Sequence, residues 1–267
     1  MKLFDMHCHL DFLPDDEPLT LANQGIARGI GAFSTTVTPA GYSRAQSLLA
    51  HCPEVHVGVG LHPWWVKDQE SKARADAERL AACITQTRFI GEIGLDFAPR
   101  HHKTAPVQIE TFEHVLDTVV SCGGDKVLSI HAVRSADKVL DMLEVRDIAK
   151  NNIFILHWFS GSSEELIRAL RLGCYFSVGV RMLESKRGRA YVRRIPHERM
   201  LLETDMPAGE GSSYSVDEWE RDLRTALTCA AQTCNQDERE FGEIIAHTSA
   251  RILTGKDTAR SITESKV

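Results

Sequence analysis

Eight short apolar runs with strand-forming character recur along this chain, and longer amphipathic segments separate them. The predicted strands are Leu3–His7, Gly31–Val37, His56–Leu61, Phe89–Ile93, Val127–His131, Ile153–His157, Tyr175–Val178 and Met200–Thr204. Helical periodicity marks, among others, Val107–Val120, Ala136–Ile148, Glu164–Leu170, Val216–Ala231 and Glu238–Ala246. This alternation predicts parallel strands joined by crossover helices. Eight such units favour an α/β fold of the (β/α)8 TIM-barrel type, while a doubly wound open sheet has the same order of elements.

The length of 267 residues suits one large α/β domain and is ample for a buried core. No linker, internal repeat or low-complexity tract marks a boundary. We therefore expect a single domain over residues 1–267, with the barrel proper at about 1–233 and a C-terminal helical extension at about 236–254.

The cysteines and the apolar segments indicate a cytoplasmic protein. Seven cysteines are scattered without a C-x-x-C pair, which argues against a disulfide framework and a thiolate zinc site. The amino-terminal residues become polar too early for a secretory signal, and no apolar run is long enough to span a bilayer. We expect reduced cysteines and no membrane association.

The net charge of -6 is not that of a typical nucleic-acid binder. The segment from Arg181 to Arg199 is locally basic, however, with seven Lys and Arg side chains and two glutamates. It is either a phosphate-binding edge or a solvated helix face.

Ionisable residues gather at the carboxyl ends of the predicted strands, where barrel enzymes carry their chemistry. In the first strand, alternation places Asp5, His7 and His9 on one face, with the histidines at the barrel mouth. The opposite face, expected to pack outward on the helices, carries Phe4, Met6 and Cys8.

Four more strands end in similar groups. Glu92 shares a face with Ile90 at the end of the fourth strand, and Asp205 follows the eighth. His131 and His157 end the fifth and sixth strands. Burying so many titratable groups without partners is costly, and a pair of metal ions would satisfy all of them. Taken singly, each histidine is more often a hydrogen-bonded core residue.

Five motifs occur in the order found in a known family: FDMHCHLD, VGLHPWW, IGEIGLD, LHWFSG and LLETDMP. Over Phe4 to about Pro207 the chain resembles the TatD family of metal-dependent deoxyribonucleases, in the amidohydrolase-like barrel superfamily. The resemblance implies that one ion is held by His7, His9, Glu92 and Asp205. It implies that Glu92, His131 and His157 hold the other, with Glu92 as the bridge. Catalysis would rest on Glu92 and Asp205, the latter as proton acceptor for a metal-activated water that attacks phosphorus.

Further residues carry two interpretations each. Glu203 either orients a histidine ligand or forms an ordinary buried ion pair. The resemblance suggests that His62 contacts substrate phosphate, and the alternative is a turn histidine held by Pro63. Trp64 and Trp65 either stack on bases or pack locally. Asp96 likewise has two interpretations, a role at the site or a purely structural role. We expect His101 and His102 at the rim rather than among the ligands.

Two departures from the family pattern concern the substrate. The family commonly has His-Ser-Arg at the fifth strand, whereas this chain reads His131-Ala132-Val133-Arg134, so the phosphate role of Arg134 is open. The loop after Asp205 reads MPAGEGSSYS, which is short and has no positive charge. Arg181, at the start of the basic segment, is a second candidate phosphate contact.

The leading hypothesis is a nuclease that hydrolyses DNA, at single strands or ends, as a 3′-exonuclease. One alternative is an amidohydrolase-type enzyme for a small amide, lactone or phosphoester. Another is a specialised subunit of a larger assembly with protein partners, such as a bacterial defence system. Two divalent ions per chain are expected, and mixed histidine and carboxylate ligands suit Mg²⁺, Mn²⁺ or Zn²⁺.

Overall fold

Parallel strands pair in chain order in this computed structural model, which describes residues 1–255. The strands are β1 (Leu3–Cys8), β2 (Ile30–Thr35), β3 (Val55–Gly58), β4 (Phe89–Asp96), β5 (Val127–Val133), β6 (Ile153–His157), β7 (Tyr175–Val178) and β8 (Met200–Leu202). They form the series β1-β2-β3 and β4-β5-β6-β7-β8. A parallel bridge from Val59 to Ile90 joins β3 to β4. The amide of Asp205 donates to the carbonyl of His7 at 3.0 Å and closes the ring between the segment after β8 and β1.

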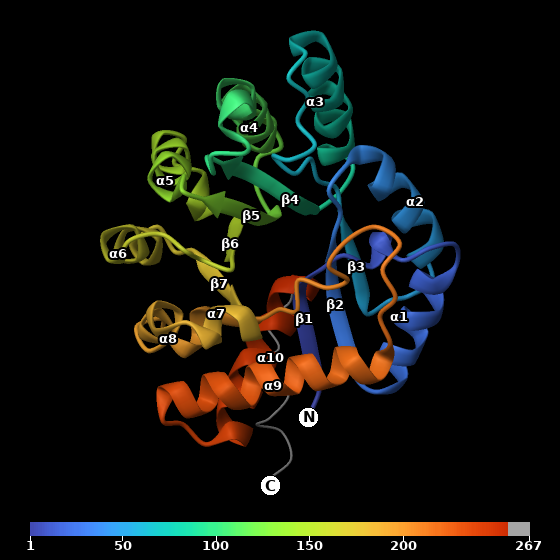
Figure 1. The fold of residues 1–267 in the computed structure, drawn as a ribbon, viewed down its shortest axis with the longest axis vertical. Coiled ribbons are helices and arrows are strands. Elements are labelled where there is room, and N and C mark those ends of the chain that lie inside the picture. Colours follow the sequence, from blue (N-terminus) through green and yellow to red (C-terminus); the bar gives the residue numbers. More distant parts are fainter. Residues whose placement is uncertain (256–267) are drawn as a thin grey trace, which may run out of the picture.

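Helices surround the strands on all sides (Figure 1). They are α1 (Glu17–Ala27), α2 (Pro39–Leu49), α3 (Glu70–Ile84), α4 (Ala105–Ser121), α5 (Ala136–Val145), α6 (Ser163–Arg171), α7 (Val180–Glu184), α8 (Lys186–Val192), α9 (Val216–Cys234) and α10 (Glu238–Thr254). Short 3-10 turns occupy η1 (Leu10–Phe12), η2 (His102–Thr104), η3 (Ile148–Lys150) and η4 (His197–Arg199). The predicted (β/α)8 barrel with an additional C-terminal helix is confirmed.

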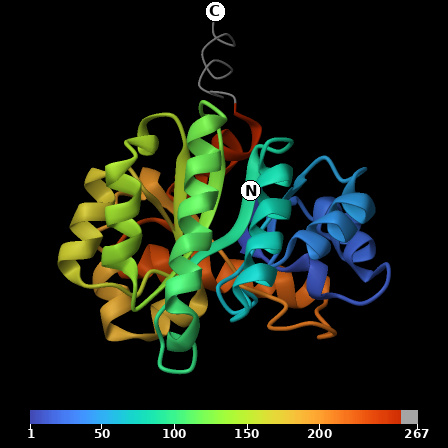
Figure 2. The ribbon, with the colours of Figure 1, turned by 90° about the horizontal axis from the view of Figure 1, so that it is seen from above.

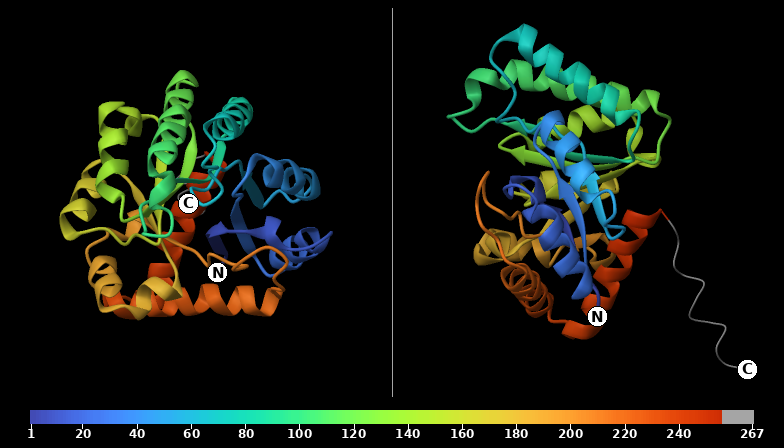
Figure 3. Two further views of the ribbon diagram at one scale, coloured as in Figure 1. Left: turned by 45° about the horizontal axis from the view of Figure 1, so that its top comes forward. Right: turned by 90° about the vertical axis from the view of Figure 1, so that its right-hand side faces the viewer.

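The outer helices pack as neighbours in chain order. Figure 2 shows α3 and α4, in teal and green, side by side on the outside of the barrel. Helix α9 crosses the barrel wall from α1 to α8, as the long orange helix of Figure 3 shows. None of the helices within residues 1–255 is long and apolar enough to cross a membrane.

Two apolar layers result. The larger fills the space between strands and helices and includes Leu116, Leu140 and Leu223. The smaller lies inside the barrel, where the side chains come from opposite strands and from the end of α10. Its buried members are Phe4, Met6, Phe33, Val127, Ile155, Tyr175, Leu201, Ile252 and Leu253. This inner layer lies directly below the polar groups of the barrel mouth.

The predicted orientation of the first strand is wrong for three of its residues. Phe4 and Met6 point into the barrel, and Asp5 points outward to the indole of Trp219 on α9. The cause is a bulge: Asp5 pairs with Ala32 but Cys8 pairs with Ser34, so β1 has one extra residue. An extra residue reverses the alternation of side chains, and this places His7 inside the barrel although Asp5 lies outside.

A second bulge corrects the prediction for Glu92. Along β4, Ile90 pairs with Leu128 and Glu92 with Ser129, so Gly91 is the extra residue. Ile90 therefore packs outward and Glu92 inward, on opposite faces. Strand β4 also continues to Asp96, so Glu92 lies in its middle rather than at its end.

Glycines allow the strands to approach closely around that bulge. A Cβ on Gly60 would lie 1.9 Å from the carbonyl oxygen of Thr36, and one on Gly91 would lie 2.5 Å from that of Gly58. The amide of Glu92 donates to the carbonyl of Thr36 at 3.2 Å. The residues following β2 and β3 thus fix the backbone of Glu92.

Candidate metal centre

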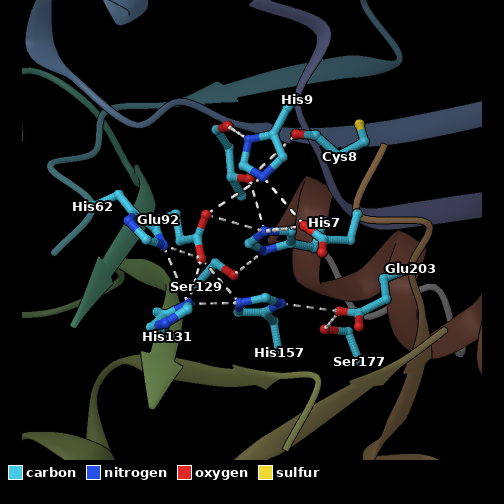
Figure 4. A network of polar contacts seen from close by, with 12 residues as sticks. His7, Cys8, His9, His62, Glu92, Ser129, His131, His157, Ser177 and Glu203 are labelled. Carbon is cyan, nitrogen blue, oxygen red and sulfur yellow. Dashed lines mark hydrogen bonds and ion pairs between the residues drawn. The ribbon is translucent and has the colours of Figure 1, made fainter. Parts of the chain in front are cut away.

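The carboxylate of Glu92 lies at the centre of the barrel mouth, surrounded by imidazole rings (Figure 4). Its Oε1 is 2.9 Å from His131 Nδ1, 2.9 Å from His157 Nε2 and 3.1 Å from His62 Nε2. Its Oε2 is 3.4 Å from His9 Nε2 and 3.6 Å from His7 Nε2. One buried carboxylate thus contacts five histidines from four segments of the chain.

In both His7 and His9, Nε2 faces the barrel mouth and Nδ1 contacts a neighbouring polar group. The Nδ1 atom of His7 is 2.7 Å from the hydroxyl of Ser129 on β5. The Nδ1 atom of His9 is 2.7 Å from the carbonyl oxygen of Thr35, and this contact requires a proton on that nitrogen. Such second contacts fix the tautomer and leave Nε2 of His9 free to bind a cation.

Asp205 closes the other side of the cluster. Its Oδ1 lies 3.3 Å from His9 Nε2 and 3.6 Å from His7 Nε2. Its backbone has a φ of 57°, in the left-handed region that is costly for a non-glycine residue. Such strain is held where the surroundings fix it, and here the hydrogen bond to His7 contributes.

Burial and mutual charge set the protonation of these groups in the absence of metal. Burial opposes ionisation of Glu92, but the surrounding histidines outweigh it and hold its pKa well below the usual range. Burial would lower the pKa of His9, but Asp205 and Glu92 raise it to about 9. Burial and the neighbouring His157 lower the pKa of His7 to about 3. The mouth therefore contains ionised, buried carboxylates that require positive charge beside them.

The donor set fits divalent metal ions. Residues 1–255 contain three groups of donor atoms that lie within 4.8 Å of one another: His7 with His9 and Glu92, His7 with His157 and Asp205, and His62 with Glu92 and His131. Two ring nitrogens, His131 Nδ1 and His157 Nε2, also lie 3.3 Å apart, so both face the same point beside Glu92. Imidazole and carboxylate together suit zinc, manganese or magnesium.

His62 differs from the other histidines. Its Nδ1 accepts a 3.0 Å hydrogen bond from the backbone amide of Trp64, so the neutral ring carries its proton on Nε2. Burial lowers the pKa of His62 to about 4, which keeps the ring neutral. A protonated Nε2 is a hydrogen-bond donor and not a ligand, so we set His62 apart from the metal-binding nitrogens despite its position.

Glu203 lies beneath His157, at the level of Ser177. Its Oε2 accepts a hydrogen bond from the Ser177 hydroxyl and is 3.7 Å from His157 Nδ1. That nitrogen is buried and has no hydrogen-bond partner within the described residues. Burial raises the pKa of Glu203. Glu203 therefore faces the Nδ1 side of His157, and its role in orienting that ring stays a prediction.

The cluster opens into a cavity of about 750 Å³. On one side of it, Trp64 donates from its indole nitrogen to Asp96 Oδ2 at 2.6 Å, and the guanidinium carbon of Arg100 lies 4.5 Å from its ring centroid. Asp96 is also 3.3 Å from His131 Nε2. This side thus combines an exposed indole with a cation.

A family model described as TatD related DNase matches residues 4–254 of this chain. The chain belongs to the TatD family. Like its relatives named as metal-dependent hydrolases, this TatD-family protein is a metal-dependent hydrolase.

Three relatives show the range of the TatD family. The metal-dependent hydrolase YjjV of Escherichia coli is 27% identical over 217 residues, covering 77% of this chain and 80% of YjjV. The crystal structure of YjjV superposes with a TM-score of 0.78 at 20% identity, covering 95% of this chain and 98% of that one. Human deoxyribonuclease TATDN3 is 27% identical over 223 residues, with 77% and 78% covered. The 3′-5′ ssDNA/RNA exonuclease TatD of Edwardsiella piscicida is 32% identical over 152 residues, 56% of each chain.

Of the sequence-predicted residues in this TatD-family protein, the fold brings the six proposed ligands, His62 and Glu203 into one cluster. Arg181 lines the cavity, with Nη1 3.8 Å from Asp205 Oδ2. Arg134 is exposed, has a φ of 54° and is not among the residues lining the cavity. The ring of His101 stacks on that of Trp64, with centroids 5.1 Å apart.

Sequence reasoning missed Ser129, Ser177 and Trp158. Ser129 and Ser177 are small polar residues in strand interiors, and an isolated buried serine carries little signal by itself. Trp158 directly follows His157, so a search of the positions after each strand would have found it.

Proposed function

We propose that this protein is a divalent-metal-dependent nuclease that hydrolyses phosphodiester bonds in DNA. The observation that carries the proposal is the buried Glu92 carboxylate, within 3.6 Å of five imidazole nitrogens at the base of an open cavity. A rim that carries the guanidinium groups of Arg100 and Arg181 beside indole rings suits a phosphate flanked by bases.

We assign the ligands as the sequence motifs suggested. His7, His9, Glu92 and Asp205 would hold one ion, and Glu92, His131 and His157 the other. Bound divalent ions supply Lewis acidity, which lowers the pKa of water and neutralises charge on the phosphate. Metal analysis of the purified protein distinguishes Mg²⁺, Mn²⁺ and Zn²⁺ as the bound ions.

The chain's own side chains have separate roles in this proposal. Asp205 is the proton acceptor: its pKa is lowered to about 2, because hydrogen bonding to His9 and nearby histidine charge outweigh burial, so it is ionised at neutral pH. His62 donates from Nε2 to a phosphate oxygen. Arg181 pairs with a phosphate at the rim.

We further propose action at the 3′ end of single strands. The names of two relatives, the deoxyribonuclease TATDN3 and the 3′-5′ ssDNA/RNA exonuclease TatD, support this substrate class. The main alternative is hydrolysis of a small phosphoester, which the absence of Arg134 from the described cavity lining favours. The acidic loop residue Glu210 at the cavity edge favours it too.

We also propose that barrel and α10 form a single domain, because Ile252 and Leu253 of α10 share an apolar cluster with Phe4. A cytoplasmic location is consistent with seven cysteines that are all unpaired.

The test compares wild type, Glu92→Ala and Val145→Ala with single-stranded DNA labelled at either end. Val145, 84% exposed on α5, is a surface control. Wild type and Val145→Ala should release labelled nucleotide from the 3′ end with Mg²⁺, Mn²⁺ or Zn²⁺, whereas Glu92→Ala should lose bound metal and nearly all activity. Chelation should abolish hydrolysis. Hydrolysis of a small phosphodiester without cleavage of DNA would instead favour the alternative.

A further inference from the structure

Trp158 has an unusual conformation beside the metal centre. It follows His157 at the end of β6, and 38% of its surface is exposed. Its φ of 39° lies in the left-handed region, which is a clear outlier for a bulky side chain. A strained backbone that presents an exposed indole next to a cluster of ionisable groups points to a functional role.

Trp158 stands between two cavities. The first, of about 750 Å³, contains the metal centre. The second, of about 340 Å³, lies on the side of α7 and α9 and is lined by Gly179, Arg221 and Thr225 among others. Three residues line both cavities: Trp158, Arg181 and Asp205. The boundary between the two spaces is therefore an indole, a guanidinium and a proposed metal ligand.

A cation marks the same boundary. The guanidinium carbon of Arg181 lies 5.4 Å from the Trp158 ring centroid, and its Nη1 is 3.8 Å from Asp205 Oδ2. Arg181 is half exposed, so it can contact a ligand without leaving this position. The guanidinium is suited to pair with a phosphate placed between the two cavities.

We propose that Trp158 is a wedge between two nucleotide subsites, one in each cavity, with the scissile phosphate at the metal centre of the first cavity, beside the boundary residue Asp205. The proposal rests on the nuclease function proposed above. The base of one nucleotide stacks on the indole of Trp158, and Arg181 holds the backbone that passes beside it. Every base offers a π face to an indole, so this contact is independent of sequence.

The wedge sets a requirement on the substrate. The two bases that flank the cleaved bond have to separate, because Trp158 and Arg181 occupy the space between the cavities. Separating neighbouring bases is easiest in a single strand and costly within a duplex. The position of Trp158 therefore favours single strands and frayed ends as substrates.

The experiment combines a protein variant with a substrate variant. The variants are Trp158→Ala and Trp158→Phe, and the substrates are single-stranded oligonucleotides that are intact or carry one abasic position on either side of the cleaved bond. Binding of the corresponding phosphorothioate oligonucleotides, followed by fluorescence anisotropy with metal present, adds a readout that does not depend on turnover. Thermal denaturation and metal content verify that each variant is folded and loaded.

The wedge predicts that Trp158→Ala lowers kcat/KM and binding for the intact strand by about tenfold, as the loss of one stacked base should. The loss should vanish with an abasic nucleotide at one of the two flanking positions and persist with it at the other. Trp158→Phe should recover most of the effect. Equal losses on intact and abasic strands, with folding and metal content normal, would overturn the wedge but leave the nuclease function standing. A wild-type protein that cuts no oligonucleotide would overturn both.

Discussion

The indole nitrogen of Trp219 donates a 2.7 Å hydrogen bond to Oδ2 of Asp5, across 214 positions of the sequence. The same carboxylate accepts from the amide of Thr204 at 3.1 Å and from its hydroxyl at 2.6 Å. Asp5 thus ties α9 and β1 to the residue that precedes Asp205. The carboxylate that sequence alternation placed inside the barrel instead supports the metal centre from outside.

Trp219→Phe tests this support. The substitution keeps an aromatic ring but removes the donor, leaving a buried carboxylate with one partner fewer. We expect the free energy of unfolding to fall by about 2 kcal/mol, measured by urea denaturation. Tyr214→Phe is the matched control, since it removes a hydrogen bond to the more exposed carboxylate of Asp222. A change no larger than that of the control would contradict the assigned importance of the Asp5 contact.

Gly60→Ala tests the close approach of backbones near Glu92. The added Cβ would lie 1.9 Å from the carbonyl oxygen of Thr36 and 2.7 Å from that of Glu92, and neither atom belongs to a side chain that can turn away. We expect destabilisation by about 3 kcal/mol or more, together with reduced metal content. Gly209→Ala, where the nearest atom is 4.0 Å away, should change stability by less than about 0.5 kcal/mol. Normal stability and metal content in Gly60→Ala would show that the strands can separate.

His62→Ala distinguishes a hydrogen-bond donor from a metal ligand. If Nε2 donates to phosphate, kcat should fall by roughly a hundredfold while metal content stays at the wild-type level. His62→Gln, which retains an N–H donor, should recover part of the loss. Metal analysis and steady-state kinetics on the same preparations decide the matter. Loss of one ion per chain in both variants would make His62 a ligand.

Below pH 6.5, the free energy of unfolding should depend on the protonation of His56, which lies away from the metal centre. Burial, assisted by the charge of Arg88, lowers the pKa of His56 below its usual 6.5. Above 6.5 the ring is neutral in both states and has no effect. Below 6.5 the unfolded chain takes up the proton first, so stability falls as the pH drops toward the lower, folded-state pKa.

His56→Gln removes this titration. Urea denaturation from pH 7.5 to pH 5, with chelator present in every sample, should show wild type losing more stability than His56→Gln over that window. Parallel curves for the two proteins would mean that the pKa of His56 is the same in the folded and unfolded states.

The sequence alone predicted eight β/α units and the polar residues that end the strands. The alternation of apolar runs with amphipathic segments is local information, and Ile153–His157 and Tyr175–Val178 are bounded in the structure as predicted. The motif order predicted six ligand residues, because motifs preserve residue types and spacing, and the structure brings these six residues into one cluster.

The tertiary structure decided which way those residues face. Bulges at β1 and β4 reverse the alternation, and they arise from pairing with neighbouring strands, which a single strand's sequence does not encode. The tautomer of His62 depends on the turn that brings the Trp64 amide to its ring. The place of Trp158 between two cavities depends on the helices that enclose them. Local sequence fixed the residue types, and the contacts between distant segments fixed the geometry that gives those residue types a function.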